Sequence, residues 1–473
     1  MSLTEKTIDI NYLEKEIYRK CFEQGRAAMA ALFEKWDEEL RQDRDKEKYR
    51  HKGKRCGVYR MIFGEVEYLR NVYEVWDDGM KVGHAYLLDE AIGISDSRRM
   101  SGILRELIAK VCCEGSYRAA ARVVSEMTGQ SLSHTGAWNV VQALGEEIDG
   151  RELQAAELAA KDKGVGTTAA AVLFEEQDGI HLKLQGKSRK AHGSGKEMKI
   201  AIAYDGTEKK GKKRYELTTK VACANFEDID EFVKRKEGAI GSVYAIDEIE
   251  IRFLGGDGAG WVRRSQTDET VHFQLDQFHR NKAVTKLVAS PDAKKAILKL
   301  LYAKEMDVDL LLHVIETEAL STDDEKERDN YMELHTYFQN NRDGLVPYQR
   351  RGLDIPAPPE GKSYRGMGAM ESNVFTIIGN RMKGGRCLWS ISGGNNLARL
   401  LCLYHTKRLS AVIDGIGNHV LPERYEKEVA VKTSAANVPQ REGKGYDGFH
   451  HYNVPSAQKG LKDIARIKPV YSF

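Results

Sequence analysis

Three acidic residues in different local settings are the residues of this sequence best suited to act together in catalysis. Asp178 and Asp257 each follow a short β-like run, and Glu371 opens an apolar stretch with helical spacing at 370–380. Two aspartates on strands and a glutamate on a helix can converge on a pair of divalent metal ions. Such ions, about 4 Å apart, hold the attacking and leaving oxygens of an in-line phosphoryl displacement. Because carboxylate oxygens are hard ligands, we expect Asp178, Asp257 and Glu371 to hold two Mg²⁺ or Mn²⁺ ions.

Two of these acids also have a simpler interpretation, and the first, Asp178, has an alternative. Asp257 lies between glycines, where aspartate is common as a turn residue. Glu371 could stabilise the positive end of a helix dipole. Asp205 ends another β-like run and is the alternative first metal ligand. We favour Asp178 over Asp205 because Asp-Gly, the dipeptide that Asp205 opens, is typical of a hairpin turn.

The segments between these acids have the pattern of an α/β domain. Residues 281–360 differ, because apolar residues recur there with helical spacing, and no strand is expected between Asp257 and the helix of Glu371. We therefore expect a helical insertion within one catalytic domain. In that domain short apolar runs predict strands at 169–174 continuing through 181–184, at 199–205, at 215–223 and at 250–254, with a helix near 228–237.

Length and composition limit the class of protein. At 473 residues the chain is too long for one core, and with 41% apolar and 30% charged residues it should be largely globular. The net charge of +2 says little about partners. No run of about 18 apolar residues is present, so no membrane partner is expected. Seven cysteines without a C-x-x-C pair, and an N-terminus without an apolar segment, favour a reducing cytoplasm without secretion.

Two helices in the N-terminal part of the chain have helix-turn-helix character. They are expected at 116–127 and from His134 to about 144, with Ser133 as the N-cap of the second helix. Because the start of such a second helix can enter a DNA groove, Ser133, His134 and Thr135 are candidate DNA contacts. A helical hairpin that only connects domains is the alternative.

Basic residues gather in the loops of the expected α/β domain. Lysine and arginine replace the counterions of a polyphosphate, so Lys187, Arg189 and Lys190 are further candidate DNA contacts. A solvated hairpin loop is the alternative interpretation of this cluster. Its other members are Lys196, Lys209, Lys210, Lys212, Lys213 and Arg214.

Four short motifs occur in an order that is more specific than any one of them. The run Asp-Gly-Ile-His-Leu-Lys begins at Asp178, and Gly-Asp-Gly-Ala-Gly-Trp surrounds Asp257. An Asp-x-x-His pair, formed by Asp276 and His279, follows the second of these. The fourth motif is Glu-Ser-Asn, which begins at Glu371. It is followed by three basic residues, Arg381, Lys383 and Arg386.

Together these motifs resemble the DDE transposases of the Mutator-like bacterial insertion sequences, and within them the ISLre-type family. The separation of 79 residues between Asp178 and Asp257, and of 114 between Asp257 and Glu371, is similar to that group. The resemblance covers residues 50–420. It implies an α/β RNase H-like catalytic domain with a mixed five-stranded sheet and a helical insertion. A mainly helical N-terminal DNA-binding region would precede that domain.

The resemblance also implies an activity, partners and a location. The protein would be a transposase that cleaves and transfers DNA strands at the ends of a bacterial insertion sequence, with water and then a DNA 3′-hydroxyl attacking a phosphodiester. His279 would support the three acids together with Asp276. Double-stranded DNA of the element ends and of the target would be its partner, and it would act as a homo-oligomer on DNA in the bacterial nucleoid. The basic residues after Glu371, namely Arg381, Lys383 and Arg386, would contact this DNA.

These expectations divide the chain into five parts. Residues 1–100 would form a helix and β-hairpin region, because helical periodicity up to about residue 50 gives way to alternating runs at 56–75. The remaining parts are a helix-turn-helix-like region at 101–165, a catalytic domain at 166–282 and 361–420, the insertion at 283–360 and a C-terminal tail at 421–473.

Two other functions are compatible with the same residues. One is a DNA-binding relic of an insertion sequence whose carboxylates are inert. The other is a repair or junction nuclease on the same fold, which strand transfer to a new DNA target would distinguish from a transposase. A zinc site is not expected, because Asp276 and His279 alone cannot provide four ligands.

Overall fold

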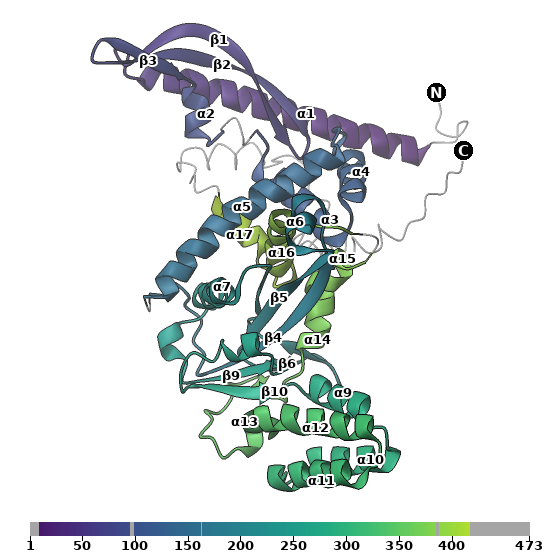
Figure 1. Ribbon diagram of the computed structural model, residues 1–473. Helices are drawn as coiled ribbons and strands as arrows, with labels where there is room; N and C mark the ends of the chain where they lie inside the picture. The colour runs from purple at the N-terminus through teal and green to yellow at the C-terminus, as the bar shows by residue number, and fades with distance from the viewer. Residues whose placement is uncertain (1–8, 95–98, 162, 385–386, 417–473) are drawn as a thin grey trace, which may run out of the picture. The chain divides into compact units, whose positions relative to one another are not determined.

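The computed structural model describes residues 9–94, 99–161, 163–384 and 387–416 (Figure 1). They divide into two compact units, one formed by the residues before Gln142 together with those from Ser410 onward, the other by Gln142–Leu409. The expected C-terminal tail at 421–473 lies outside the described residues. None of the helices in the described ranges is long and apolar enough to span a lipid bilayer.

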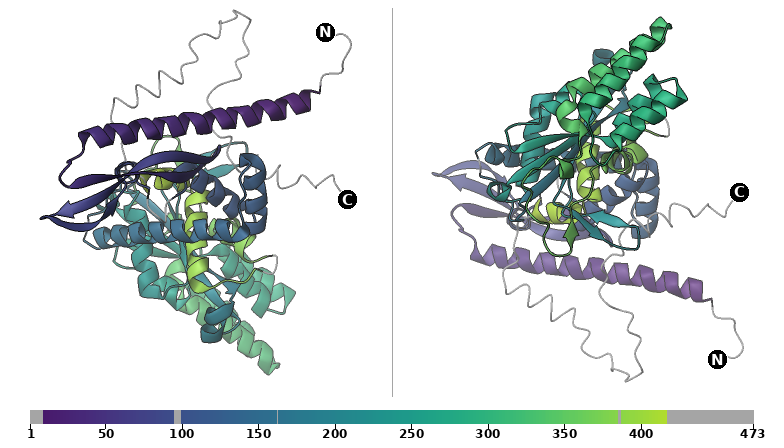
Figure 2. Two further views of the ribbon diagram at one scale, coloured as in Figure 1. Left: turned by 90° about the horizontal axis from the view of Figure 1, so that it is seen from above. Right: turned by 90° about the horizontal axis from the view of Figure 1, so that it is seen from below.

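The first unit begins with a long helix that packs on a three-stranded antiparallel sheet (Figures 1 and 2). Phe33 and Trp36 of the helix contact Val66 and Tyr68 of the central strand, because apolar residues recur with helical spacing on one element and alternate on the other. The hairpin expected at 56–75 is present and extends beyond both of these ends. The elements are α1 (Ile10–Asp43), β1 (Tyr49–Met61), β2 (Gly64–Asp77), β3 (Met80–Ala85) and α2 (Leu87–Ala91).

The helices that follow include the expected helix pair. Ser133 caps the second helix of the pair, since its Oγ accepts a hydrogen bond from the N–H of Gly136 at 3.0 Å. That helix is much longer than expected and continues into the second unit. The elements are α3 (Gly102–Glu114), α4 (Tyr117–Thr128) and α5 (His134–Ala159), with α17 (Leu409–Ile416) near the end of the described chain.

The second unit contains the predicted mixed five-stranded sheet. Its strand order is β10-β9-β4-β5-β8, in which β4 is parallel to β9, β9 is parallel to β10, and β5 is antiparallel to both β4 and β8. Three of the four expected strands correspond to β4, β5 and β9. The strands are β4 (Val172–Lys183), β5 (Gly195–Tyr204), β8 (Val221–Asn225), β9 (Ile251–Gly256) and β10 (Val271–Leu275).

Two strand predictions are corrected by the structure. The strand expected at 215–223 is interrupted near Thr219, whose φ of +47° breaks an extended backbone, so its two ends belong to different sheets. A strand also lies between Asp257 and Glu371, where none was expected. This is β10, whose pattern Val-His-Phe-Gln-Leu alternates over only five residues.

A second, smaller sheet adjoins the first through the end of β5. It has the order β11-β6-β7 and is antiparallel throughout. Its strands are β6 (Thr207–Lys209), β7 (Tyr215–Leu217) and β11 (Lys362–Ser363).

The two faces of strand β4 are covered by different segments, because successive side chains of a strand point to opposite sides. Glu175 points toward α7 (Ile229–Gly241), where its carboxylate pairs with Lys236 at 2.5 Å. Phe174, the residue before it, packs against the ring of Tyr364, with ring centroids 5.3 Å apart. The face that carries Phe174 is therefore the one that the segment leading to Glu371 covers.

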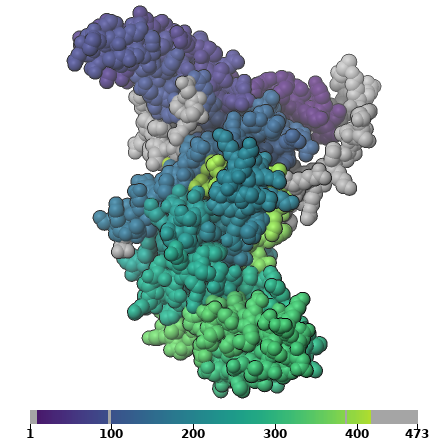
Figure 3. Space-filling model, viewed as in Figure 1, coloured from purple at the N-terminus to yellow at the C-terminus, as the bar shows by residue number. Residues whose placement is uncertain are grey.

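The stretch expected to be a helical insertion folds mainly into five α-helices that share one apolar cluster with the sheet. Leu311 of α11 and Leu334 of α12 belong to the same buried cluster as Leu254 of β9 and Phe273 of β10. Figure 3 shows these helices as a closely packed lobe, coloured green. They are α9 (Gln277–Leu287), α10 (Pro291–Leu301), α11 (Val308–Ser321), α12 (Glu325–Asn340) and α13 (Arg342–Leu345).

Glu371 lies on a helix, as expected. The helix begins as α14 (Met370–Asn373), widens to a π-helical segment at Val374–Gly379 and ends as α15 (Asn380–Met382). Helix α16 (Ile391–His405) follows and packs against β8.

Candidate active site

The register of the parallel strands brings two of the predicted acids to one level of the sheet. In the β4–β9 ladder Val172 pairs with Ile251 and Glu176 pairs with Gly255. The same register, continued by two residues, sets Asp178 opposite Asp257. The spacing of 79 residues thus corresponds to one alignment of neighbouring parallel strands.

Asp276 lies near the same level of the sheet, directly after the third strand, β10. Its backbone N–H donates to the Gly256 carbonyl at 2.8 Å, just beyond the last pair of the β10–β9 ladder. Its carboxylate accepts a hydrogen bond from the N–H of His279 at 3.0 Å and so caps helix α9. Asp276 therefore sets the first turn of the helix that carries His279.

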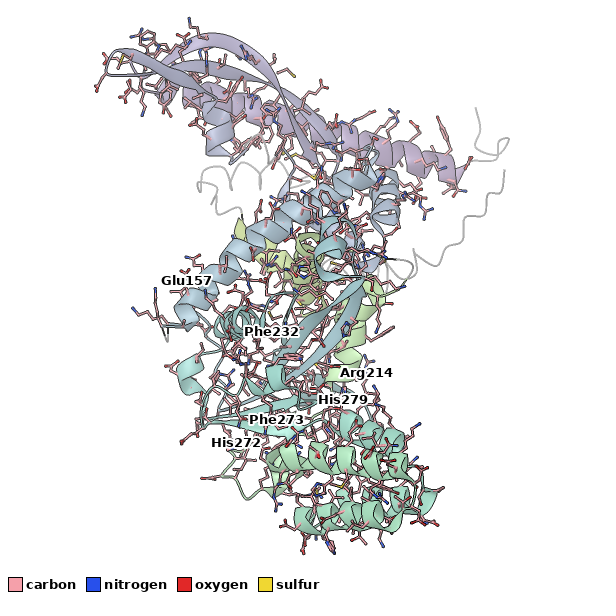
Figure 4. All side chains as sticks on the ribbon, in the orientation of Figure 1. Glu157, Arg214, Phe232, His272, Phe273 and His279 are labelled. Carbon is pink, nitrogen blue, oxygen red and sulfur yellow. The ribbon has the colours of Figure 1, made fainter. Side chains whose placement is uncertain are left out.

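His279, which is labelled in Figure 4, faces Asp178 of β4. Its Nε2 lies 3.7 Å from the Oδ2 of Asp178, while the Oδ1 of Asp178 accepts from the N–H of Gly179 at 2.7 Å. The pKa of His279 is raised, first by Asp178 and further by the charges of Asp276 and Asp257. When His279 is protonated, its imidazolium lies where it offsets part of the negative charge of these carboxylates.

Glu371 completes the group that the structure brings together. Asp178, His279 and Glu371 each have one ligand atom within 4.8 Å of the others, and Glu371 is exposed while the other two are partly buried. Asp257 is not a member of this group. It lies one strand away and lines an open groove of about 670 Å³ together with His279.

A buried carboxylate outside the set of predicted site residues attaches the helix of Glu371 to the sheet. The Oε2 of Glu176 accepts hydrogen bonds from the N–H groups of Gly368 and Met370, each at 3.0 Å. Its Oε1 accepts from the hydroxyl of Tyr204 at 2.6 Å. Burial raises the pKa of Glu176, and the hydrogen bonds from Tyr204 and from the backbone at Met370 oppose that effect. The signal in the sequence was an acidic pair, Glu175-Glu176, directly after the apolar run Val172-Leu-Phe.

The loop of Asp257 is held by the helical insertion. The carboxylate of Asp257 accepts from the N–H of Ala259 at 2.8 Å, and its carbonyl accepts from the Tyr337 hydroxyl of α12 at 2.8 Å. Gly258 has a φ of +85°, and a Cβ there would lie 2.3 Å from the side chain of Asn341. The glycine is needed both for the turn and for the close approach of the insertion.

Asp205, the alternative first ligand, lies elsewhere. It is 3% exposed, and its carboxylate accepts from the hydroxyls of Thr218 at 2.6 Å and Thr219 at 3.0 Å and from the Lys362 ammonium at 2.7 Å. It follows Tyr204, which pairs with Phe174, so it lies toward the other end of β4 from the level of Asp178. Three donors already occupy its oxygens.

The candidate DNA contacts of the second unit differ in their exposure. Lys187, Arg189 and Lys190 are exposed on α6 (Gly186–His192), and Lys383 is exposed as well. Arg381 is 9% exposed and its guanidinium lies over the ring of Trp389, so it packs inside the unit instead of facing solvent. Arg386 lies outside the described residues, and the exposed residues Ser133, His134 and Thr135 belong to the first unit.

The donor atoms fit a hard divalent cation. Asp178 and Asp257 each keep one carboxylate oxygen that does not accept a backbone hydrogen bond, and Glu371 is exposed beside them. Carboxylate oxygens suit Mg²⁺ and Mn²⁺, and an imidazole nitrogen is compatible with Mn²⁺. Asp178, His279 and Glu371 could hold one such ion, with Asp257 beside it on the next strand.

Comparison with known proteins places the chain in a family. The family model described as an uncharacterised protein family, UPF0236, matches residues 3–412, so the chain belongs to that family. A protein of Streptococcus gallolyticus, described as the UPF0236 protein in the vanSb 3′ region, is 24% identical over 350 residues, which are 72% of this chain and 70% of the relative. Among solved structures, the Drosophila P element transposase strand transfer complex matches with a TM-score of 0.24 and 10% identity, over 72% of this chain and 84% of that chain. A likeness at this TM-score is too weak to decide fold or function.

Proposed function

We propose that this protein is a transposase that cleaves and joins DNA strands by metal-dependent phosphoryl transfer. One observation carries the proposal. Asp178, His279 and Glu371 present ligand atoms within 4.8 Å of one another, at the level of the sheet where the register also sets Asp257. Two carboxylates and a histidine from three separate segments converge there, and a third carboxylate, Asp257, lies beside them after the next strand.

The architecture around these residues supports an RNase H-like catalytic domain. The resemblance to the Mutator-like DDE transposases implies three features that this unit has: a mixed five-stranded sheet, acids at one level of two neighbouring parallel strands, and a glutamate on a later helix. The helices between β10 and β11 correspond to the insertion in the same resemblance. Within the Mutator-like DDE transposases, we propose that this protein belongs to the ISLre-type family.

Metal-dependent phosphoryl transfer requires the protein to neutralise the phosphate charge and to position the reacting oxygens, and little else. Divalent cations held by Asp178, Asp257 and Glu371 would neutralise the phosphate and orient the attacking and leaving oxygens. The residues around these acids hold them in place, since Glu176 attaches the helix of Glu371 and Asp276 orients the helix of His279. No serine, tyrosine or cysteine nucleophile is required, because water or a DNA 3′-hydroxyl attacks directly.

The exposed basic residues supply contacts for the substrate. Lys187, Arg189 and Lys190 lie on a short helix attached to the segment after Lys383, because the N–H of Gln185 donates to the Trp389 carbonyl at 2.9 Å. We assign these lysines and the arginine to the DNA backbone, and the start of α5 in the first unit to a groove of the element ends. Arg381 is left out of this assignment because it is buried.

Cleavage and joining of DNA test the proposal directly. Purified protein is mixed with end-labelled DNA from both flanks of its own gene and with an unlabelled plasmid, in Mg²⁺ or Mn²⁺ or in excess chelator. We expect metal-dependent nicks at the element ends and labelled products joined to the plasmid. Nicks without joined products would favour a nuclease on the same fold, and binding without nicks would favour an inert relic. Undiminished cleavage in chelator would rule out the metal-dependent mechanism.

A further inference from the structure

An exposed hairpin of the second unit carries the densest group of positive charges near the candidate site. Strands β6 and β7 pair in register, with Lys209 opposite Tyr215, and the N–H of Lys210 donates to the Arg214 carbonyl at 2.9 Å to close the turn. Every residue from 209 to 214 is exposed (Arg214 is labelled in Figure 4). The tip, which we call the basic arm, contains Lys209, Lys210, Lys212, Lys213 and Arg214.

Nearby acids neutralise only part of the charge of this arm. Lys210 pairs with Glu208 at 2.7 Å, while Glu216, the other acid of the hairpin, pairs with Lys407 at 3.0 Å. Within the described ranges, no ion pair is formed by Lys209, Lys212 or Lys213. The arm therefore presents several uncompensated cations to solvent, which repel one another unless an anion lies against them.

A buried carboxylate fixes the base of the arm. Asp205 precedes β6 and accepts hydrogen bonds from Thr218 and Thr219, which follow β7, and from Lys362 of β11. Thr219 is held at a φ of +47°, a conformation that is uncommon for a residue other than glycine. These contacts hold the two ends of the arm together and fix the position from which its tip projects.

The arm is connected to the segment that leads to Glu371. β11 of the same small sheet begins this segment, and the guanidinium of Arg365 lies 3.7 Å from the centroid of the Tyr215 ring. Along β4, the pairing partner of Tyr204 is Phe174, four residues before Asp178. At about 3.3 Å per residue, the base of the arm lies roughly 13 Å along the strand from the acidic centre.

We propose that the basic arm binds the sugar-phosphate backbone of double-stranded DNA a few base pairs from the phosphate that reacts. Charge complementarity selects this partner, since a duplex presents one negative charge per about 1.7 Å of its axis and a row of lysines replaces its counterions. The inference rests on the proposed function for the choice of DNA, and it gives Asp205 the role of a positioning residue for the arm.

Salt-dependent binding of the full chain tests this interaction without any catalysis. In the arm variant, Lys209, Lys212, Lys213 and Arg214 are replaced by serine. In the matched control variant, four exposed lysines of the helical insertion without ion pairs are replaced by serine, namely Lys295, Lys299, Lys304 and Lys326. Binding to a labelled duplex of unrelated sequence is measured in chelator between 50 and 200 mM salt.

We expect the arm variant to bind at least tenfold more weakly at 50 mM salt. The slope of log K against log salt should become shallower by about 0.9 for each phosphate that the arm no longer neutralises, and the control variant should behave as the wild type. Equal affinity and slope for the arm variant and the control would overturn the proposal. If the arm variant binds more weakly but the wild type does not cleave DNA, the DNA-binding role of the arm is supported and the proposed transposase activity is rejected.

Chemical footprinting covers the case in which the arm variant does not fold. Acetylation of lysines in the wild-type protein is compared with and without the duplex. Protection of Lys212 and Lys213, but not of Lys295 and Lys299, is expected, and unchanged acetylation of Lys212 and Lys213 would contradict binding by the arm. Asp205→Asn should raise the rate of trypsin cleavage within 209–214 in the free protein, because it loosens the base of the arm, and an unchanged rate would remove Asp205 from this role.

Discussion

The carboxylate of Glu176 accepts a hydrogen bond from the backbone N–H of Met370 at 3.0 Å, so the helix that carries Glu371 is attached to strand β4 next to Asp178. The two residues lie 194 positions apart in the chain. Glu176 and Asp178 point to the same side of β4 because they are two residues apart. One strand thus supplies a proposed metal ligand and the anchor for a second one.

Removing this anchor should destabilise the protein. In Glu176→Ala the hydroxyl of Tyr204 and the N–H groups of Gly368 and Met370 lose their buried acceptor, which should lower the free energy of unfolding by about 3 kcal/mol or more. Urea unfolding in chelator measures the change. The exposed acid Glu157 provides a control, because Glu157→Ala should change stability by less than about 0.5 kcal/mol. A loss below about 1 kcal/mol in Glu176→Ala would mean that other contacts hold the helix.

Neutralising the proposed ligands should separate chemistry from DNA binding. Asp257→Asn and Glu371→Gln keep the side-chain shape but remove the charge that a metal ion needs, so strand cleavage should be lost while DNA binding persists. Metal-free stability should stay equal or rise, since repulsion among like charges is relieved. Asp205→Asn is the comparison, because it should lose stability and some DNA affinity through the loosened arm, yet still cleave the DNA that it binds. Wild-type cleavage by Glu371→Gln would remove this glutamate from the site.

Metal binding should stabilise the folded protein before any DNA is added. An ion that binds only the folded state raises its stability by about 2.7 kcal/mol at one hundred times its dissociation constant. Thermal unfolding in increasing Mn²⁺ should therefore show a rising midpoint in the wild type and in Asp205→Asn. The rise should be absent in Asp178→Asn. An equal rise in Asp178→Asn would place the ion elsewhere.

The pH dependence of stability should report the pair formed by His279 and Asp178. The pKa of His279 is raised in the folded metal-free protein, chiefly by Asp178. A raised pKa contributes stability that is fully present below the unfolded value of about 6.5 and is lost as the pH rises through the folded value. His279→Asn should therefore cost more stability at pH 5.5 than at pH 8.5 in chelator. The exposed histidine of α11 gives the control, His313→Asn, which should show no such difference.

The helix pair of the first unit should affect recognition and not chemistry. His134 and Thr135 are exposed at the start of α5, whereas Ser133 caps that helix and its replacement would cost about 1 kcal/mol of stability. Replacing His134 and Thr135 by alanine should weaken binding to the DNA of the element ends more than to unrelated DNA. Competition assays with both duplexes measure this preference. An unchanged preference for the DNA of the element ends would indicate that the helix pair only connects domains.

Local patterns in the sequence were sufficient to predict the strands and the helix that carry the candidate acids. The apolar runs before Asp178 and Asp257 form strands β4 and β9, and the helical spacing after Glu371 forms a helix, because periodicity acts over a few residues. The cap of α5 at Ser133 is equally local. The short strand β10 was missed, since five alternating residues do not distinguish a strand from a loop.

Contacts between distant segments were decided only by the tertiary structure. The antiparallel register of β5 carries Asp205 away from the level of Asp178, and burial turns Arg381 toward Trp389 and not toward solvent. Glu176 has partners more than 190 residues away, which no local pattern encodes. Strand register and side-chain burial depend on how the whole unit packs, so the sequence by itself determined which residues could do the chemistry, and packing decided which of them meet.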